Sequence, residues 1–101
     1  MPRYKEGVRH AGLAIEIRKI LPLLDDVHRQ LAGREAIITS ALDGVHMRNS
    51  LHYKGLAIDL RTRDLKNGVP QKLVRILKEK LGRSYDIVLE PDHIHLEYDP
   101  K

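Results

Sequence analysis

Two short segments of the chain alternate between aliphatic and polar residues, and this alternation constrains the fold more than any other feature of the sequence. In residues 55–61, Leu56, Ile58 and Leu60 alternate with Ala57, Asp59 and Arg61, and in residues 93–98, Ile94, Leu96 and Tyr98 alternate with His93, His95 and Glu97. Successive side chains of a β-strand point to opposite faces. We therefore expect a sheet with one face in the core, whose other face carries His93, His95 and Glu97 and can share them with Asp59.

The remaining elements follow from periodicity and from the positions of glycine and proline. Apolar residues at helical spacing predict a main helix from Leu13 to Gly33, and Pro22 should kink this helix or divide it in two. A short strand at the start of this stretch is the alternative. Residues 36–40 favour a strand, residues 43–50 a surface loop, and Pro70 can open a helix that stops at Gly82.

Residues 85–90 and 93–98 are both β-favouring and are separated by only two residues, which predicts a hairpin or a sharply bent strand. With the helices on either side of these segments in the sequence, the predicted fold class is α+β, with a small antiparallel sheet flanked by two main helices.

The length of 101 residues fits one compact domain over residues 1–101. Residues 1–11 are polar and lack periodicity, which predicts an arm that is mobile or lies over the domain surface. The chain has no Cys, so disulfides and thiolate ligands are excluded. Any metal site must therefore use His nitrogens and carboxylate oxygens, which favours a catalytic metal over a structural one.

The net charge of the chain favours anionic partners but does not identify one. Eighteen basic and fourteen acidic residues give a net charge of +4, which could draw the chain towards an anionic cell wall, nucleic acid or lipid headgroups. The sequence lacks the aromatic platforms and recognition motifs of nucleic-acid-binding domains. We expect a monomer without a nucleic-acid or membrane partner.

The sequence also suggests where the chain is made. No segment approaches the ~20 apolar residues that cross a membrane, and the N-terminus lacks the apolar stretch of a secretory signal. We therefore expect a protein made in the cytoplasm, which reaches an external substrate only if another route releases it.

Four of the six histidines lie in or beside the predicted strands and loop, namely His46, His52, His93 and His95. A short antiparallel sheet could bring these imidazoles next to Asp59. Two His and one Asp are a suitable set for a catalytic zinc ion, because the fourth position remains for water. The alternative for each histidine is an ordinary surface residue at a strand edge. We assign no site role to His10 in the polar arm, or to His28, which we place on the main helix outside its apolar stripe.

Two motifs resemble a known family. Residues 50–59 read Ser-Leu-His-Tyr-Lys-Gly-Leu-Ala-Ile-Asp, which matches the Ser-x-His-x-x-Gly-x-Ala-x-Asp signature of zinc D-Ala-D-Ala carboxypeptidases and L-Ala-D-Glu peptidases. Residues 92–95, Asp-His-Ile-His, are similar to their second motif. The resemblance implies the fold that these peptidases share with the Hedgehog signalling domain. It also implies a zinc peptidase that hydrolyses an amide bond in peptidoglycan stem peptides.

The resemblance further implies roles for individual residues. His52, Asp59 and His95 would hold the zinc ion. Asp92 would be the general base that takes a proton from the metal-activated water and returns it to the leaving amine. His93 would hydrogen-bond the oxyanion or the substrate carbonyl.

A second alignment of the second motif is possible, because residues 90–93, Glu-Pro-Asp-His, also read as Glu-x-x-His. It would make Glu90 the base and His93 the ligand. We prefer His95, because the tandem His-x-His form in the family normally uses its second His. Glu90 then becomes a substrate contact or a supporting residue at the edge of the site.

The chain departs from the family pattern after residue 40, where many members carry an Arg that helps to bind the substrate and this chain has Ala-Leu-Asp. Arg48 is the nearest replacement, and Arg61 and Arg63 are further candidates. His46 matches a His that flanks the metal in Hedgehog domains, so we expect it to line the cleft. Gly55 should allow a tight turn.

Two kinds of function remain open. The resemblance favours a D,D-carboxypeptidase or an L-Ala-D-Glu endopeptidase, and a short catalytic domain of this kind is similar to phage-encoded lysis or virion proteins. The alternative is a non-catalytic module of the same fold that keeps zinc for folding or for partner recognition. The carboxylate at Asp92 argues against this alternative, because a purely structural site needs no base.

Overall fold

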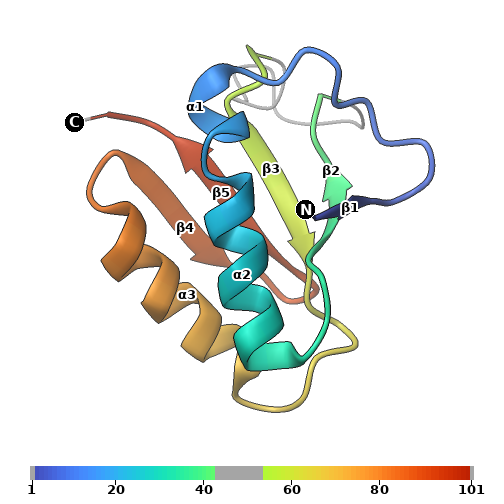
Figure 1. Cartoon of the computed structure of the whole chain (residues 1–101), viewed down its shortest axis with the longest axis vertical. Helices are drawn as coiled ribbons and strands as arrows, with labels where there is room; N and C mark the ends of the chain where they lie inside the picture. The colour runs from blue at the N-terminus through green and yellow to red at the C-terminus, as the bar shows by residue number, and fades with distance from the viewer. Residues whose placement is uncertain (1, 43–53, 101) are drawn as a thin grey trace.

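A mixed β-sheet with two long helices on one of its faces makes up the described part of the chain (Figure 1). The computed structural model describes residues 2–42 and 54–100. The elements in chain order are β1 (Arg3–Tyr4), α1 (Ile15–Arg18), α2 (Leu21–Ala32), β2 (Ile37–Ser40), β3 (Ala57–Arg61), α3 (Val69–Leu81), β4 (Tyr85–Leu89) and β5 (His93–Tyr98). Both α2 and α3 lie in front of the sheet in Figure 1, so they cover the same face. The predicted α+β class is confirmed.

The sheet has the strand order β1-β2-β3-β5-β4 and is mixed, which corrects the prediction of an antiparallel sheet. The pairs β2–β3, β3–β5 and β4–β5 are antiparallel as expected, but β1 pairs with β2 in parallel. The backbone N–H groups of Arg3 and Lys5 donate to the carbonyl oxygens of Ala36 and Ile38, each at 2.8 Å. A strand of two residues is too short to show alternation, so the sequence of the polar arm gave no sign of it.

The long apolar stretch that we predicted as the main helix forms two helices. α1 ends at Arg18 and α2 begins at Leu21, with Pro22 in the first turn of α2. Inside a continuous helix the Pro22 ring would clash with the carbonyl of Arg18, four residues earlier, and would offer no N–H to it. The predicted division at Pro22 is therefore confirmed, and the alternative of a strand at the start of this stretch is wrong. α2 ends at Gly33, whose φ of 74° is the left-handed conformation that suits a glycine cap.

α3 also follows its prediction. Pro70 lies in its first turn, Gly82 follows its last residue, and Leu73 and Leu77 are buried. Across residues 2–42 and 54–100, no helix has both the length and the apolar character needed to cross a membrane.

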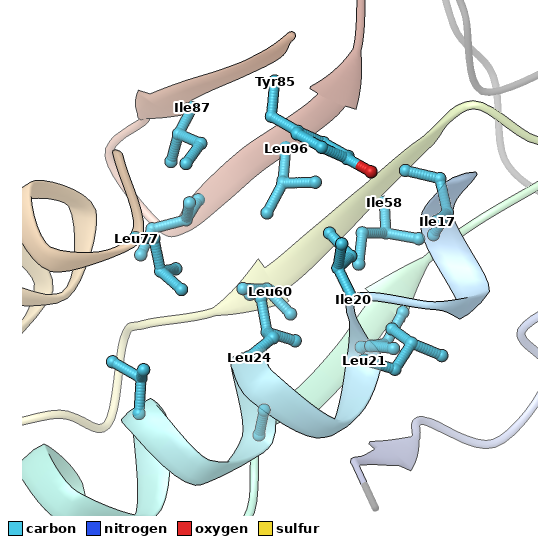
Figure 2. Close-up of a cluster of buried hydrophobic side chains, with 14 of the residues drawn as sticks. Ile17, Ile20, Leu21, Leu24, Ile58, Leu60, Leu77, Tyr85, Ile87 and Leu96 are labelled. Atoms are coloured by element: carbon cyan, nitrogen blue, oxygen red, sulfur yellow. The ribbon is translucent and has the colours of Figure 1, made fainter. Parts of the chain in front are cut away.

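The hydrophobic core lies between the sheet and the two long helices. Ile58 and Leu60 of β3 and Leu96 of β5 pack with Leu24 of α2 and Leu77 of α3, and each of these residues is at most 1% exposed (Figure 2). The predicted alternation of β3 and β5 therefore sets which face of the sheet is buried. Their polar residues are left on the opposite face.

The turn before β3 requires glycine. Gly55 has a φ of +73°, and a Cβ added there would collide with the carbonyl oxygen of Gly12. The carbonyl of Gly55 accepts a hydrogen bond from the N–H of Ala14 at 2.9 Å, which ties this turn to the start of α1. The tight turn predicted at Gly55 is confirmed, whereas Leu56, which we expected in the core, precedes β3 and is only partly buried.

His28 is buried, which corrects its placement outside the apolar stripe. It is 1% exposed, and it lies four residues after Leu24, on the same side of α2. Its Nδ1–H donates to the carbonyl oxygen of Arg34 at 2.8 Å. His28 is thus a core residue that fixes the chain just after α2.

Asp25 lies one turn before His28 and is 2% exposed. Its carboxylate accepts hydrogen bonds from the backbone N–H of Ala36 and from Nε of Arg29, both at 2.9 Å. Burial alone would raise the pKa of Asp25, but these hydrogen bonds outweigh it and hold the pKa below its usual value. We call Asp25, His28 and Arg29 the helix-side cluster, because it joins the end of α2 to the start of β2.

Candidate metal centre

The polar face of the sheet gathers the acidic and imidazole side chains of β3 and β5. In the antiparallel pairing of these strands, Asp59 lies opposite His95, Arg61 opposite His93, and Ala57 opposite Glu97. Residues directly opposite each other in such a pair point to the same face. Asp59, His93, His95 and Glu97 therefore share one face, as the alternation predicted.

Three of these side chains form a continuous hydrogen-bonded chain. Nδ1 of His95 lies 3.1 Å from Oδ1 of Asp59, and Nε2 of the same ring lies 2.6 Å from Oε1 of Glu97. The side chains are partly buried, with 13% of Asp59 and 23% each of His95 and Glu97 exposed. We call this arrangement the Asp59–His95–Glu97 chain.

The two carboxylates raise the pKa of His95 to about 8. The hydrogen bond with Asp59 is the largest cause, and the hydrogen bond with Glu97 adds to it, while burial of the ring acts in the opposite direction. In the metal-free protein the imidazolium form can donate to both carboxylates at once. A cation in the place of the Nδ1 proton would satisfy the same pair of groups.

The separation of Asp59 and His95 fits two ligands of one zinc ion. Zn–N and Zn–O bonds of about 2.0–2.1 Å with tetrahedral angles place two ligand atoms about 3.3 Å apart. The 3.1 Å between Oδ1 of Asp59 and Nδ1 of His95 is close to this value. The predicted third ligand, His52, lies outside the described residues.

Within the described residues, one group of three acidic or imidazole side chains is close enough to share an ion, and it is not the predicted one. It consists of Asp86, Glu97 and Asp99, whose candidate ligand atoms all lie within 4.8 Å of one another. Acidic groups of this kind are common at protein surfaces without an ion. We therefore treat the pair of Asp59 and His95 as the centre of the site.

The residues of the second motif lie beside this pair. Nδ1 of His93 lies 2.7 Å from Oδ1 of Asp92, and Nε2 of the same ring lies 3.9 Å from Oδ1 of Asp59. The hydrogen bond from His93 holds the pKa of Asp92 below its usual value. The Asp92 side chain is 76% exposed, so its carboxylate is open to solvent beside its contact with His93.

A small polar pocket connects the second motif to Asp59. It has a volume of about 140 Å³ and is lined by Lys5, Thr39, Asp59, Arg61, Arg63, Asp92 and His93. Three of its lining residues are cationic, and they come from the segment after β1, from β3 and from the loop after β3. Two others, Asp59 and Asp92, are anionic, so the lining carries a small excess of positive charge.

The other predicted site residues are placed differently. Glu90 lines a separate pocket of about 510 Å³, formed with residues between Thr62 and Gln71, and does not line the pocket of Asp59. Its backbone N–H donates to the carbonyl of His93 at 2.8 Å, which closes the turn between β4 and β5. The predicted substrate contacts His46 and Arg48 lie outside the described residues, like His52.

Two residues of the site had no role in the sequence analysis. Glu97 was expected on this face, and its position two residues after His95 was a usable signal for contact between the two side chains. Lys5 gave no signal, because its position in the pocket depends on the parallel pairing of β1.

A scan of the chain against models of known protein families and a search of curated proteins both found no match.

Proposed function

We propose that the chain is a zinc-dependent peptidase that hydrolyses an amide bond in peptidoglycan stem peptides, and that its sheet and helices form the fold of D-Ala-D-Ala peptidases and the Hedgehog signalling domain. The observation that carries the proposal is the 3.1 Å contact between Asp59 and His95. These residues come from the two separate sequence motifs, 36 positions apart, and lie opposite each other on β3 and β5.

The proposed ligands are His52, Asp59 and His95. Zinc held by them would supply a Lewis acid and a water molecule whose pKa is lowered to about 7. Asp92 would accept a proton from the nucleophile and pass it to the leaving amine, because it lines the same pocket as Asp59 and its carboxylate is exposed. His93 would donate a hydrogen bond to the substrate carbonyl.

The distances support the alignment in which His95 is the ligand. Oδ1 of Asp59 is 3.1 Å from the His95 ring and 3.9 Å from the nearest nitrogen of His93. Glu90, the base of the second alignment, lines a different pocket. Asp92 is therefore the better candidate for the base.

The cations of the polar pocket support a substrate with a carboxylate near the scissile bond. Lys5, Arg61 and Arg63 line it together with Asp59. A D-Ala carboxypeptidase substrate ends in such a carboxylate, and an L-Ala-D-Glu substrate carries one on the residue after the bond. Both cleavage types remain within the proposal, which places the action of the protein at the cell wall.

The second candidate is a zinc-containing binding module of the same fold. It is favoured by the close pairing of Asp92 with His93, which lowers the pKa of Asp92 and makes its carboxylate a weaker base near neutral pH. In this case zinc would bind without hydrolysis of any stem peptide.

The test combines metal content and muropeptide hydrolysis on the same preparations. Wild type should carry about one zinc per chain, as a mononuclear site of this ligand set would. His95→Ala should lose both metal and activity, and Asp92→Ala should keep the metal but lose about 10²–10⁴-fold in turnover, the usual contribution of a general base. Zinc without hydrolysis in wild type would favour the binding module, and wild type without zinc would remove the metal site altogether.

Two substitutions on other parts of the surface serve as matched controls. Asp26→Ala removes an exposed carboxylate from α2, on the other side of the sheet, and His10→Ala removes an exposed imidazole. Both variants should keep wild-type zinc content and turnover. If Asp26→Ala lowers turnover as much as Asp92→Ala does, the role of Asp92 as base is wrong.

A further inference from the structure

We propose that Glu97 is a positioning residue that holds the His95 ring with its proton on Nε2, so that Nδ1 faces Asp59 as a metal ligand. The metal-binding part of this inference rests on the proposed function. The orientation of the ring by Glu97 is a property of the chain alone and can be measured without metal.

The geometry of β5 brings Glu97 to His95. The two residues are separated by Leu96, so their side chains point to the same face of the sheet. Oε1 of Glu97 lies 2.6 Å from Nε2 of His95, which is closer than the 3.1 Å between Nδ1 and Asp59. The Glu97 contact is therefore the shorter of the two contacts on the ring, although the Asp59 contact contributes more to the raised pKa of His95.

The chemistry of imidazole gives this contact its consequence. A neutral imidazole has one N–H donor and one bare nitrogen, and a carboxylate can only accept. When Nε2–H donates to Glu97, the bare nitrogen of the neutral ring is Nδ1, which lies 3.1 Å from Oδ1 of Asp59, so that these two atoms can bind the same cation. A carboxylate that accepts the second N–H of a ligand histidine fixes its tautomer and strengthens it as a ligand.

An acidic neighbour of Glu97 offers a control for the charge of this residue. Asp86 lies opposite Glu97 in the pairing of β4 with β5, and both belong to the acidic group that includes Asp99. Asp86→Asn removes one charge from the same group and leaves the carboxylate of Glu97 in place.

The first measurement is the tautomer of His95 in the metal-free protein, determined by NMR of the ring nitrogens when the imidazole is neutral. Wild type and Asp86→Asn should have the proton on Nε2. In Glu97→Leu the proton should shift towards Nδ1, because Asp59 then remains as the carboxylate partner among the described contacts. Glu97→Gln keeps an acceptor oxygen, so its population of the tautomer with the proton on Nε2 should be closer to that of wild type than the population in Glu97→Leu.

The second measurement is the zinc dissociation constant, determined by competition with a chelator. Loss of an outer partner of a ligand histidine typically weakens metal binding by about 10–100-fold, and we expect this change in Glu97→Leu. Glu97→Gln should lose less, and Asp86→Asn should bind as wild type does. Circular dichroism of each metal-free variant checks that it folds. If Glu97→Leu does not fold, the zinc dissociation constants of Glu97→Gln and Asp86→Asn are compared instead.

The outcomes separate this inference from the proposed function. A wild-type tautomer together with wild-type zinc affinity in Glu97→Leu would overturn the positioning role. Equal losses in Glu97→Leu and Asp86→Asn would also overturn it, because the effect would then come from the charge of the acidic group. If wild type binds no zinc, the proposed function fails, and the tautomer measurement still decides whether Glu97 orients His95.

Discussion

Among the residues that the structure describes, an arrangement of carboxylate and imidazole on the helix side of the sheet differs in its construction from the Asp59–His95–Glu97 chain on the other side. In the helix-side cluster, Asp25 accepts from a backbone N–H and from Arg29, and the imidazole of His28 donates to a backbone carbonyl. Asp25 and His28 are at most 2% exposed. In the Asp59–His95–Glu97 chain, one imidazole lies between two carboxylates, and all three side chains are partly exposed.

The two arrangements direct the same residue types towards different groups. The polar groups of the helix-side cluster are directed to the backbone, so they join α2 to β2. The Asp59–His95–Glu97 chain places two anionic groups on one ring beside a pocket with three cationic residues, which is an arrangement suited to a ligand. We therefore expect substitutions in the first cluster to change stability, and substitutions in the second to change binding.

The largest stability effect is expected for Asp25→Ala. The substitution leaves the buried N–H of Ala36 without its acceptor, and an unsatisfied buried donor costs about 1–3 kcal/mol of the free energy of unfolding. Denaturant titration of the metal-free protein measures this loss, and zinc affinity should remain that of wild type. Asp25→Asn keeps an acceptor for Ala36 and should lose less. A loss of zinc affinity in Asp25→Ala at unchanged stability would contradict the structural role.

The two histidines should give opposite pH dependences of stability in the metal-free protein. Burial lowers the pKa of His28 below its usual 6.5, so the unfolded chain takes up the proton first, and stability present above pH 6.5 is lost as the pH falls. The pKa of His95 is raised to about 8, so the stability that it adds is complete below pH 6.5 and is lost as the pH rises through about 8.

Denaturant titrations across this pH range test the two contributions separately. His28→Asn keeps an amide donor for Arg34 and should flatten the acid side of the stability curve. His95→Gln should flatten the alkaline side. If either substitution changes the acid and the alkaline sides of the stability curve equally, the assignment of one side to each histidine is wrong.

The smallest effect is expected for the exposed ion pair next to the helix-side cluster. Nη2 of Arg34 lies 2.6 Å from Oδ1 of Asp64, but the two side chains are 32% and 49% exposed. Exposed pairs contribute about 0–1 kcal/mol and weaken with salt. Asp64→Asn should therefore change the free energy of unfolding by less than Asp25→Ala does, and high salt should reduce the difference. An equal effect of the two substitutions would mean that burial does not distinguish these carboxylates.

Much of the fold could be predicted, because its signals are local. Leu and Ile alternate with polar residues in β3 and β5, and Pro22, Gly33, Pro70 and Gly82 mark helix ends through their own backbone limits. β1 could not be predicted, because two residues have no period and its partner is β2, more than thirty positions away. His28 was misplaced because an imidazole was treated as polar, although it occupies a core position of α2.

The candidate site could be predicted in part. The alternation placed Asp59, His93 and His95 on one face, but spacing along the chain does not give the register between strands. Only the pairing of β3 with β5 puts Asp59 opposite His95 and leaves His93 opposite Arg61. The roles of Asp92, His93 and Glu90 come from the family resemblance and stay predictions, as do those of His46, Arg48 and His52.

The separation of Asp59 and His95 in the sequence also has a consequence for how the protein refolds. α3, β4 and β5 follow one another closely, so their contacts close short loops, whereas the pairing of β3 with β5 brings together residues 36 positions apart at Asp59 and His95. Contacts of high sequence separation pay their loop-closure entropy before they gain stability, and they tend to form late. We therefore expect Asp59 and His95 to meet after β4 has paired with β5, and a probe of their contact would report a later step of folding than a probe of the β4–β5 pairing.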